Sequence, residues 1–221
     1  MKLIFFQKKK ISILILLFNV FIKRGFFHFL YEVLDLIFID LKYNSKTYAR
    51  KNDGIDNYVP YYTGFFVKIL RILKNKINFK NSYFIDLGSG KGRILLKSSE
   101  YNFFKVIGVE KNKNFYTECK NVLVKNNLTK KVNLINKDFL KFKYKFLSKK
   151  NIVFFWYNPS NKTYLIKAIK SYKKKYKKNN VYLIIIPSSS VPNLPFIKKI
   201  KILNNFSNDK SRNLALIKIL N

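Results

Sequence analysis

Histidine and cysteine are almost absent from this chain of 221 residues, which contains one of each. The single cysteine, Cys119, excludes a disulfide within the chain and favours a reducing compartment, the cytoplasm. One cysteine and one histidine are too few ligands for an ordinary zinc site, so no metal is expected. The histidine, His28, lies in the apolar stretch Phe-Phe-His-Phe-Leu, which is typical of a packed ring rather than of a catalytic base.

Apolar runs long enough to cross a membrane are also missing. The run from Ile11 to Ile22 covers about 12 residues, whereas a spanning helix needs about 20. The residues after it offer no small-residue cleavage site of the kind that follows a signal peptide. Because cations flank the run on both sides, three interpretations stay open: packing on the domain, contact with an anionic membrane surface, and a true anchor. The second would place the protein at the inner face of the membrane.

Acidic residues are scarce: 11 Asp and Glu stand against 45 Lys and Arg, for a net charge of +34. Such a surplus favours nucleic acid or an anionic membrane surface as a partner. The alternative is biased coding in an AT-rich genome, because Lys, Asn, Ile, Phe and Tyr are all abundant and the charge is spread over every segment. Apolar residues make up 48% of the chain, enough for a buried core.

From Tyr83 onward, short apolar runs alternate with amphipathic segments. Strands are expected at 83–87, 106–110, 132–135, 152–157 and 181–186, and helices at 93–101, 113–126 and up to 172. Two more strands, at 200–206 and 213–220, have no helix between them and predict an antiparallel hairpin at the sheet edge. The predicted fold is α/β: a Rossmann-like, doubly wound, mainly parallel seven-stranded sheet with a C-terminal antiparallel hairpin.

The residues before this alternation predict a helical extension. A second apolar helix is expected at 26–40, followed by a turn-rich loop at 43–62 whose clearest breaker is Asn52-Asp53-Gly54. We therefore divide the chain into an N-terminal helical extension at 1–50, with the membrane surface as one possible contact, and a cofactor-binding domain at 51–221.

The strongest motif is the loop Asp86-Leu-Gly88-Ser89-Gly90-Lys-Gly92-Arg93, at a predicted strand-to-helix junction. In such sheets ligands bind at the carboxyl ends of the strands. Glycines let a ligand lie against the main chain, Asp86 could meet an amine, and N–H groups at the helix start could meet a carboxylate. A nicotinamide fingerprint would need glycine at Arg93, and a P-loop would need glycine at Ile85 and Ser or Thr at Gly92.

Two more acids fall at predicted strand ends, although acids are rare in this chain. Glu110 ends the second strand, where a carboxylate accepts hydrogen bonds from ribose hydroxyls. Asp138 follows the third strand and could contact an adenine amino group. The alternative role of Asp138 is to cap a turn.

These segments resemble the class I methyltransferases that use S-adenosylmethionine (SAM). A closer resemblance is to small bacterial proteins of unassigned substrate in that class, which share the loop, a Tyr-x-Pro at Tyr58-Val-Pro60 and an Asn-Pro at Asn158-Pro159. The resemblance covers about residues 50–187. It implies SAM as the cofactor and a methyl transferase activity, with these contacts: Asp86, Gly88, Ser89, Gly90, Gly92, Glu110, Asp138, Phe139, Tyr62 and Thr63.

The resemblance leaves the methyl acceptor open. The loop is also similar to that of Dot1-like lysine methyltransferases, which implies a protein lysine. Amino methyltransferases of nucleic acids carry Asn-Pro-Pro and an aromatic residue where this chain has Asn158-Pro-Ser-Asn161, so the stacking ring is absent. Tyr157 and Asn158 are the candidates for orienting an amine. The alternative is that Asn158 ends a strand and that Pro159 begins a helix. A protein that has the fold without the activity is a further alternative.

Overall fold

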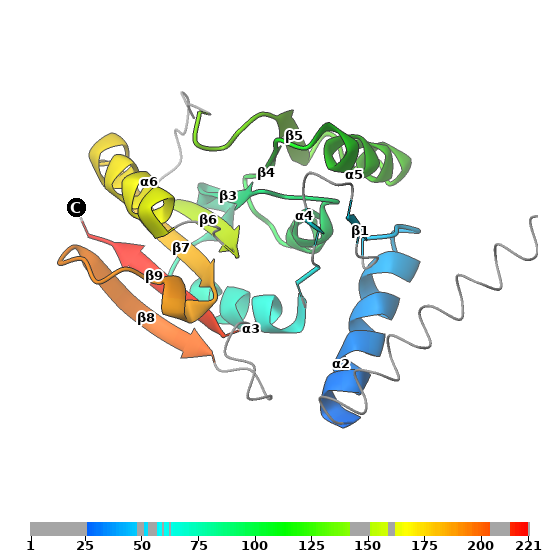
Figure 1. The fold of residues 1–221 in the computed structure, drawn as a ribbon, viewed down its shortest axis with the longest axis horizontal. Helices are drawn as coiled ribbons and strands as arrows, with labels where there is room; N and C mark the ends of the chain where they lie inside the picture. The colour runs from blue at the N-terminus through cyan, green and yellow to red at the C-terminus, as the bar shows by residue number, and fades with distance from the viewer. Residues whose placement is uncertain are drawn as a thin grey trace, which may run out of the picture.

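The computed structural model describes residues 26–47, 51–52, 57–58, 60–61, 63–141, 151–158, 162–203 and 213–220. Over these residues one seven-stranded sheet has the order β5-β4-β3-β6-β7-β9-β8 (Figure 1). The strands are β3 (Ser82–Leu87), β4 (Lys105–Glu110), β5 (Val132–Asn136), β6 (Asn151–Tyr157), β7 (Asn180–Ile186), β8 (Ile197–Leu203) and β9 (Leu214–Ile219).

The first five strands are parallel, and β8 and β9 are antiparallel to their neighbours, which confirms the predicted fold class. The chain leaves β7, forms the edge strand β8, and returns to insert β9 between them. β8 begins at Ile197, three residues before the predicted start at Ile200. Its burial pattern has exposed lysines between half-buried positions, which weakened the apolar signal at its beginning.

Helices cover both faces of the sheet. On one face pack α3 (Thr63–Lys74), α4 (Arg93–Ser99) and α5 (Lys113–Lys125), and on the other packs α6 (Lys162–Lys175). Strand residues alternate between the faces: Phe84 faces α3 and α4, whereas Ile85 belongs to the cluster around α6. Both faces of β3 are therefore buried, which is why its residues read as one apolar run.

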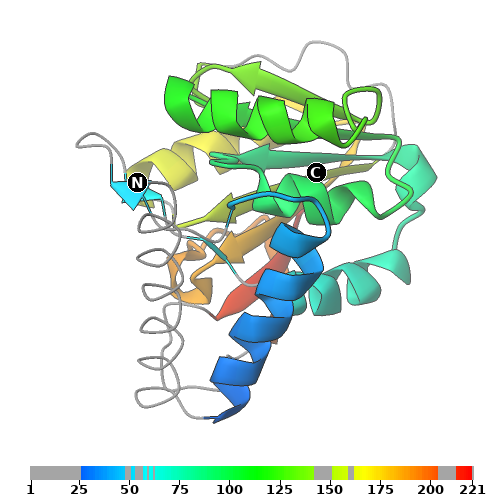
Figure 2. The ribbon, with the colours of Figure 1, turned by 90° about the vertical axis from the view of Figure 1, so that its right-hand side faces the viewer.

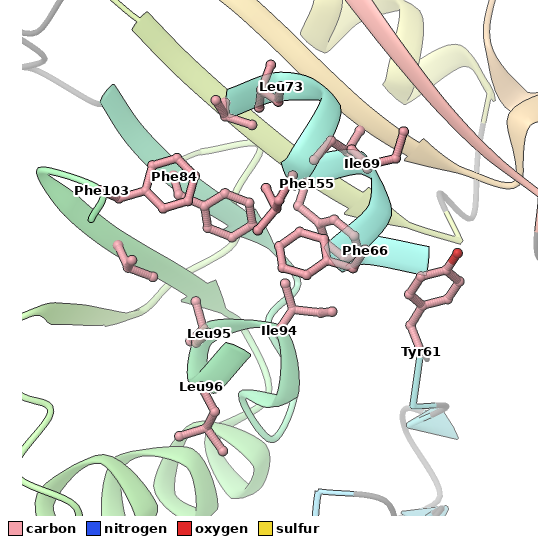
Figure 3. Close-up of a cluster of buried hydrophobic side chains, with 14 of the residues drawn as sticks. Tyr61, Phe66, Ile69, Leu73, Phe84, Ile94, Leu95, Leu96, Phe103 and Phe155 are labelled. Carbon is pink, nitrogen blue, oxygen red and sulfur yellow. The ribbon is translucent and has the colours of Figure 1, made fainter. Parts of the chain in front are cut away.

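Aromatic rings fill the core beneath α3. Figure 3 shows Phe103, Phe84, Phe155 and Phe66 in a row, with Tyr61 at its end. Phe66 meets Phe84 and Phe155 edge to face, at centroid distances of 5.5 and 5.4 Å. Such pairs add specific geometry to apolar burial, so the row sets the position of α3 on the sheet.

The second N-terminal helix is present as predicted. It consists of α2 (Phe26–Asp35) and a π-helical continuation, η1 (Leu36–Leu41). Figures 1 and 2 show α2 at the margin of the molecule, with its N-terminal end projecting away from the sheet. The apolar run at 11–22 and the side chain of His28 lie outside the described residues. In the described part of the chain, no helix is both long and apolar enough to cross a membrane.

The expected loop at 43–62 contains a short antiparallel ribbon. Its strands are β1 (Lys51–Asn52) and β2 (Asn57–Tyr58), on either side of the predicted breaker. Before the ribbon, Ile39 and Tyr43 belong to the same buried cluster as Phe66 and Leu95. The segment expected to be an extension thus contributes side chains to the core of the α/β domain.

A buried arginine joins this segment to the sheet. The Arg93 guanidinium is 2% exposed and donates from Nη2 to Asp35 Oδ2, at 2.9 Å, and from Nη1 to Thr47 Oγ1, at 2.9 Å. Asp40 Oδ1 lies 3.3 Å from Nη1. Asp35 also accepts the backbone N–H and the hydroxyl of Thr63, the first residue of α3. One polar cluster therefore connects α2, α3 and α4.

Replacing Arg93 by alanine is expected to lower the free energy of unfolding by about 3–5 kcal/mol, because both buried carboxylates would lose their cation. Lys97→Ala, one turn further along α4, removes a partly exposed pair with Glu100 and should cost about 0–1 kcal/mol. Urea unfolding of the three proteins measures both values. Equal losses in the two variants would show that the buried cluster does not hold the segment.

Candidate cofactor site

A cavity of about 490 Å³ opens at the carboxyl ends of β3, β4 and β6. This is where a doubly wound sheet offers its ligand site, because loops after neighbouring parallel strands diverge there. The lining comes from the glycine loop, the strand ends and the residues after β5: Tyr61, Asp86, Leu87, Gly88, Ser89, Gly90, Arg93, Ile94, Glu110, Lys111, Phe115, Asp138, Phe139, Leu140, Phe155, Trp156, Tyr157, Asn158 and Tyr164.

Asp86 is the most deeply buried acid of the cavity, at 3% exposure. Within the described part of the chain, no residue donates a hydrogen bond or an ion pair to its carboxylate. Burial, and then the nearby Glu110 carboxylate, raise the pKa of Asp86 well above its ordinary value. A buried carboxylate that has no donor is suited to a cationic ligand, because the ligand's positive charge would favour the ionised form of Asp86.

The glycine loop turns back on the sheet. The N–H groups of Gly88 and Ser89 donate to the Val109 carbonyl on β4, at 2.9 and 3.1 Å. Gly88 has a φ of +79°, and no atom lies within 4 Å of the position a Cβ would take, so a ligand can approach its backbone. The buried Ser89 hydroxyl has no hydrogen-bond partner among the described residues.

Gly92 has a different role in the same loop. Its φ is +85°, and a Cβ there would come within 2.3 Å of Cys119 Sγ on α5. Gly92 does not line the cavity and permits close packing of α4 on α5 instead. Lys91 also points away from the cavity and pairs with Glu118 of α5 at 3.3 Å, in agreement with the exclusion of a P-loop.

Glu110 holds the end of the loop. Its Oε2 accepts the Gly90 N–H at 2.7 Å, and its Oε1 accepts the Asn112 N–H at 2.7 Å. A carboxylate oxygen can accept more than one hydrogen bond, and Glu110 also lines the cavity. Glu110 thus orders the loop and remains a candidate to bind hydroxyl groups.

The residues after β5 and the end of β6 form an apolar wall of the cavity that includes one acid. Phe139 meets Trp156 at a centroid distance of 5.0 Å and an interplanar angle of 77°. Asp138 accepts the Leu140 N–H at 2.9 Å, which is the turn-capping role considered above, and it also lines the cavity. An aromatic base could lie beside Phe139, with Asp138 at its edge.

The opposite end of the cavity is built around Tyr157 and Asn158. Tyr61, which sequence reasoning missed, packs on Tyr157 with ring centroids 5.1 Å apart. Asn158 has a φ of +49°, and its N–H donates to the Ile186 carbonyl at 2.6 Å. This left-handed turn, which asparagine tolerates better than most residues, places Asn158 at the exposed mouth of the cavity.

Among the predicted cofactor contacts, Thr63, like Gly92, has other surroundings. Thr63 does not line the cavity, because its side chain is buried against Asp35. Tyr62 lies outside the described residues, as do Pro159, Ser160 and Asn161. Arg93 was expected only as the start of a helix. The signal that could have found its role was the presence of two acids, Asp35 and Asp40, in an apolar helix of a chain that has few acids.

Solved structures show the same arrangement of strands and helices. The N-terminal domain of human METTL16, in complex with SAH, superposes with a TM-score of 0.59 at 11% identity, covering 86% of this chain and 81% of that one. A SAM-dependent methyltransferase from Clostridium acetobutylicum gives 0.52 at 12%, covering 73% and 92%. SMU.1697c from Streptococcus mutans, also with SAH, gives 0.52 at 18%, covering 70% and 97%.

The chain has the fold of the SAM-dependent methyltransferases. No family model matches the sequence, and no curated protein sequence matches it significantly. The likeness is therefore one of fold, and the functional argument depends on the residues of the cavity.

Asp86→Asn is expected to stabilise the ligand-free protein at pH 8, by about 1 kcal/mol or more, since it removes a buried charge beside Glu110. The pKa of Asp86 is higher in the folded protein than in the unfolded chain. Above the unfolded pKa, the ionised carboxylate therefore lowers the free energy of unfolding, and this loss grows until the pH passes the folded pKa. The gain should vanish below about pH 4. Thermal unfolding across pH 4–8 tests this, and a pH-independent or negative effect would contradict it.

Proposed function

We propose that the protein is a SAM-dependent methyltransferase whose cofactor binds in the cavity beside Asp86. The supporting observation is the buried Asp86 carboxylate, which lacks a donor among the described residues and lies next to an open glycine backbone. A ligand that carries a zwitterionic amino-acid group, a sugar and a base would find a chemically suitable partner for each part among the residues that line this cavity. The fold shared with proteins solved with SAH supports the same ligand.

In this proposal each end of the cofactor meets a different strand end. Asp86 would accept the ammonium group, and the main chain around Gly88 would lie against the amino-acid moiety. The Glu110 carboxylate, which lines the cavity at the end of β4, would accept hydrogen bonds from the ribose hydroxyls. Asp138 would accept from the adenine amino group while Phe139 packs on the ring. Ser89, whose hydroxyl has no partner in the described part of the chain, is a further candidate hydrogen-bond donor.

The cofactor supplies a methyl group already activated on a sulfonium, so the protein mainly has to align the acceptor and exclude water. Tyr61 and Tyr157 form an aromatic wall next to Asn158. The Asn158 amide oxygen can accept a hydrogen bond from an attacking amine and thereby direct its lone pair. An amide cannot accept the proton that the attacking amine must lose. That proton would pass from the amine to solvent at the open mouth of the cavity.

The acceptor in this proposal is an N or O nucleophile, with a protein lysine as the first candidate. Its amine is small enough to reach past Tyr61 and Tyr157 without a stacking platform at Ser160 or Asn161. The second candidate, RNA or DNA, is favoured by one observation, the net charge of +34. A non-catalytic binding protein would share the cavity but transfer no methyl group.

Calorimetry with SAM tests cofactor binding. Asp86→Asn and Glu110→Gln should each weaken binding about 10- to 100-fold, as expected when a charged partner is removed from a hydrogen bond. Glu100→Gln is the matched control: this partly exposed acid at the C-terminal end of α4 pairs with Lys42 and Lys97 outside the cavity, so the variant should bind SAM normally. Because burial and Glu110 raise the pKa of Asp86, the affinity of the native protein should increase with pH through that raised value. Absence of SAM binding by the folded native chain would refute the proposed function.

Labelled methyl transfer from SAM to fractionated protein and RNA identifies the acceptor class. A protein lysine acceptor predicts label in the protein fraction that resists ribonuclease and changes little between 50 and 200 mM salt. A nucleic-acid acceptor predicts label lost with ribonuclease or deoxyribonuclease and a steep decline over the same salt range. Asn158→Ala should reduce transfer more than it reduces SAM binding. Label in neither fraction, with SAM bound, would support the non-catalytic alternative.

A further inference from the structure

The helix formed by α2 and η1 has an apolar outer face. Phe26, Leu30, Leu34, Phe38 and Leu41 are 57%, 39%, 38%, 58% and 68% exposed. They recur at intervals of four, four, four and three residues, which brings them to one side of a helix. We call these five residues the α2 stripe.

The inner face of the same helix is polar and fixed in place. Asp35 and Asp40 are buried and bind Arg93, and Ile39 packs in the main core. The helix cannot rotate its stripe inward without breaking the buried Arg93 cluster. The buried cluster therefore holds the stripe on the outer side of the helix.

The stripe is also where large exposed apolar side chains concentrate. Eleven of them are exposed in the described residues, and five form the stripe, whereas the other six are scattered over other elements. Isolated exposed apolar residues are ordinary, but a contiguous set is typical of an interaction surface. Figure 2 shows α2 at the margin of the molecule, and the exposed fractions of the five side chains place the stripe in contact with solvent.

We propose that the α2 stripe docks on an anionic lipid surface, with α2 lying in the plane of the interface. The sequence on both sides of the stripe supports this partner. Lys23 and Arg24 precede α2, Lys42 and Lys46 follow η1, and the apolar run 11–22 comes just before. Cations beside an apolar helix face attract anionic headgroups while the apolar side chains enter the acyl boundary.

The two acids of this helix whose side chains the structure describes strengthen the case. Asp35 and Asp40 would repel an anionic surface if they faced outward, but both are buried against Arg93. A second copy of the chain is a poorer occupant, because two molecules of net charge +34 would repel one another. The lipid proposal is independent of the methyltransferase activity, since it involves the helix face opposite the cavity loop.

Co-sedimentation of the full chain with vesicles tests the proposal. Vesicles of phosphatidylcholine with 30% phosphatidylglycerol should bind the native protein, and pure phosphatidylcholine should bind it at least tenfold less. Phe38→Glu with Leu41→Glu should reduce binding to the anionic vesicles at least tenfold. The control pair, Val124→Glu with Ile202→Glu, makes the same charge change at exposed apolar sites on α5 and β8 and should reduce binding less than threefold.

A single substitution that keeps an aromatic side chain tests the stripe even if the double glutamate variant does not fold. Phe38→Trp adds a fluorophore to the stripe, whereas the native Trp156 is buried at 4% exposure. Its emission should shift to the blue on adding anionic vesicles, and that of the control Val124→Trp should not.

Several results would overturn the proposal. The first is failure of the native chain to bind anionic vesicles. The second is an equal loss of vesicle binding in the stripe pair and in the control pair. The third is vesicle binding that survives the Phe38→Glu, Leu41→Glu pair while the emission of Phe38→Trp does not shift. The last result would assign binding to the segment before Phe26. A lipid-free dimer in sedimentation velocity, dispersed by the stripe pair alone, would instead assign the stripe to a second copy.

Discussion

The Arg93 guanidinium, buried between the carboxylates of Asp35 and Asp40, connects the N-terminal segment with the cofactor loop. Its backbone begins α4 directly after the glycine turn, and its side chain reaches α2. Asp35 extends the connection by binding the first residue of α3. The C-terminal end of α2 and the N-terminal ends of α3 and α4 thus meet beside the cavity.

The cavity itself contains charge that does not favour folding. Asp86 and Glu110 are both buried at adjacent strand ends, and Glu110 is held by backbone N–H groups whereas Asp86 has no such donor among the described residues. A fold tolerates such a group where a ligand later supplies the opposite charge. The same acid that weakens the empty protein would select an ammonium group over a neutral one.

The helix α2 has one face that contacts the residues beside the cavity and another face that is exposed at the molecular surface. The buried face fixes the helix to the cavity loop, and the exposed face presents five apolar side chains. If lipid binds the stripe, the rigid connection through Arg93 gives the cavity a defined orientation relative to that surface. A chain of net charge +34 suits such a contact, whether the surplus of cations reflects an anionic partner or biased coding.

Local sequence was sufficient for the parallel strands, the order of strand and helix, and the acids at the strand ends. Those features depend on short-range patterns: a strand buried on both faces reads as an apolar run, as in β3, and a strand-to-helix turn with φ above zero requires glycine at Gly88 and Gly92. The C-terminal hairpin was also predictable, because no helix fits between its strands.

Tertiary structure decided the rest, because those contacts join residues far apart in the chain. The pairing of Arg93 with Asp35 and Asp40, the packing of Tyr61 on Tyr157, and the burial of Thr63 away from the cavity have no local pattern. The sequence alone determined that a glycine loop with flanking acids forms at the edge of a doubly wound sheet. Only the folded chain decided which side chains face the cavity and which face of α2 remains open, since both depend on how helices pack in space.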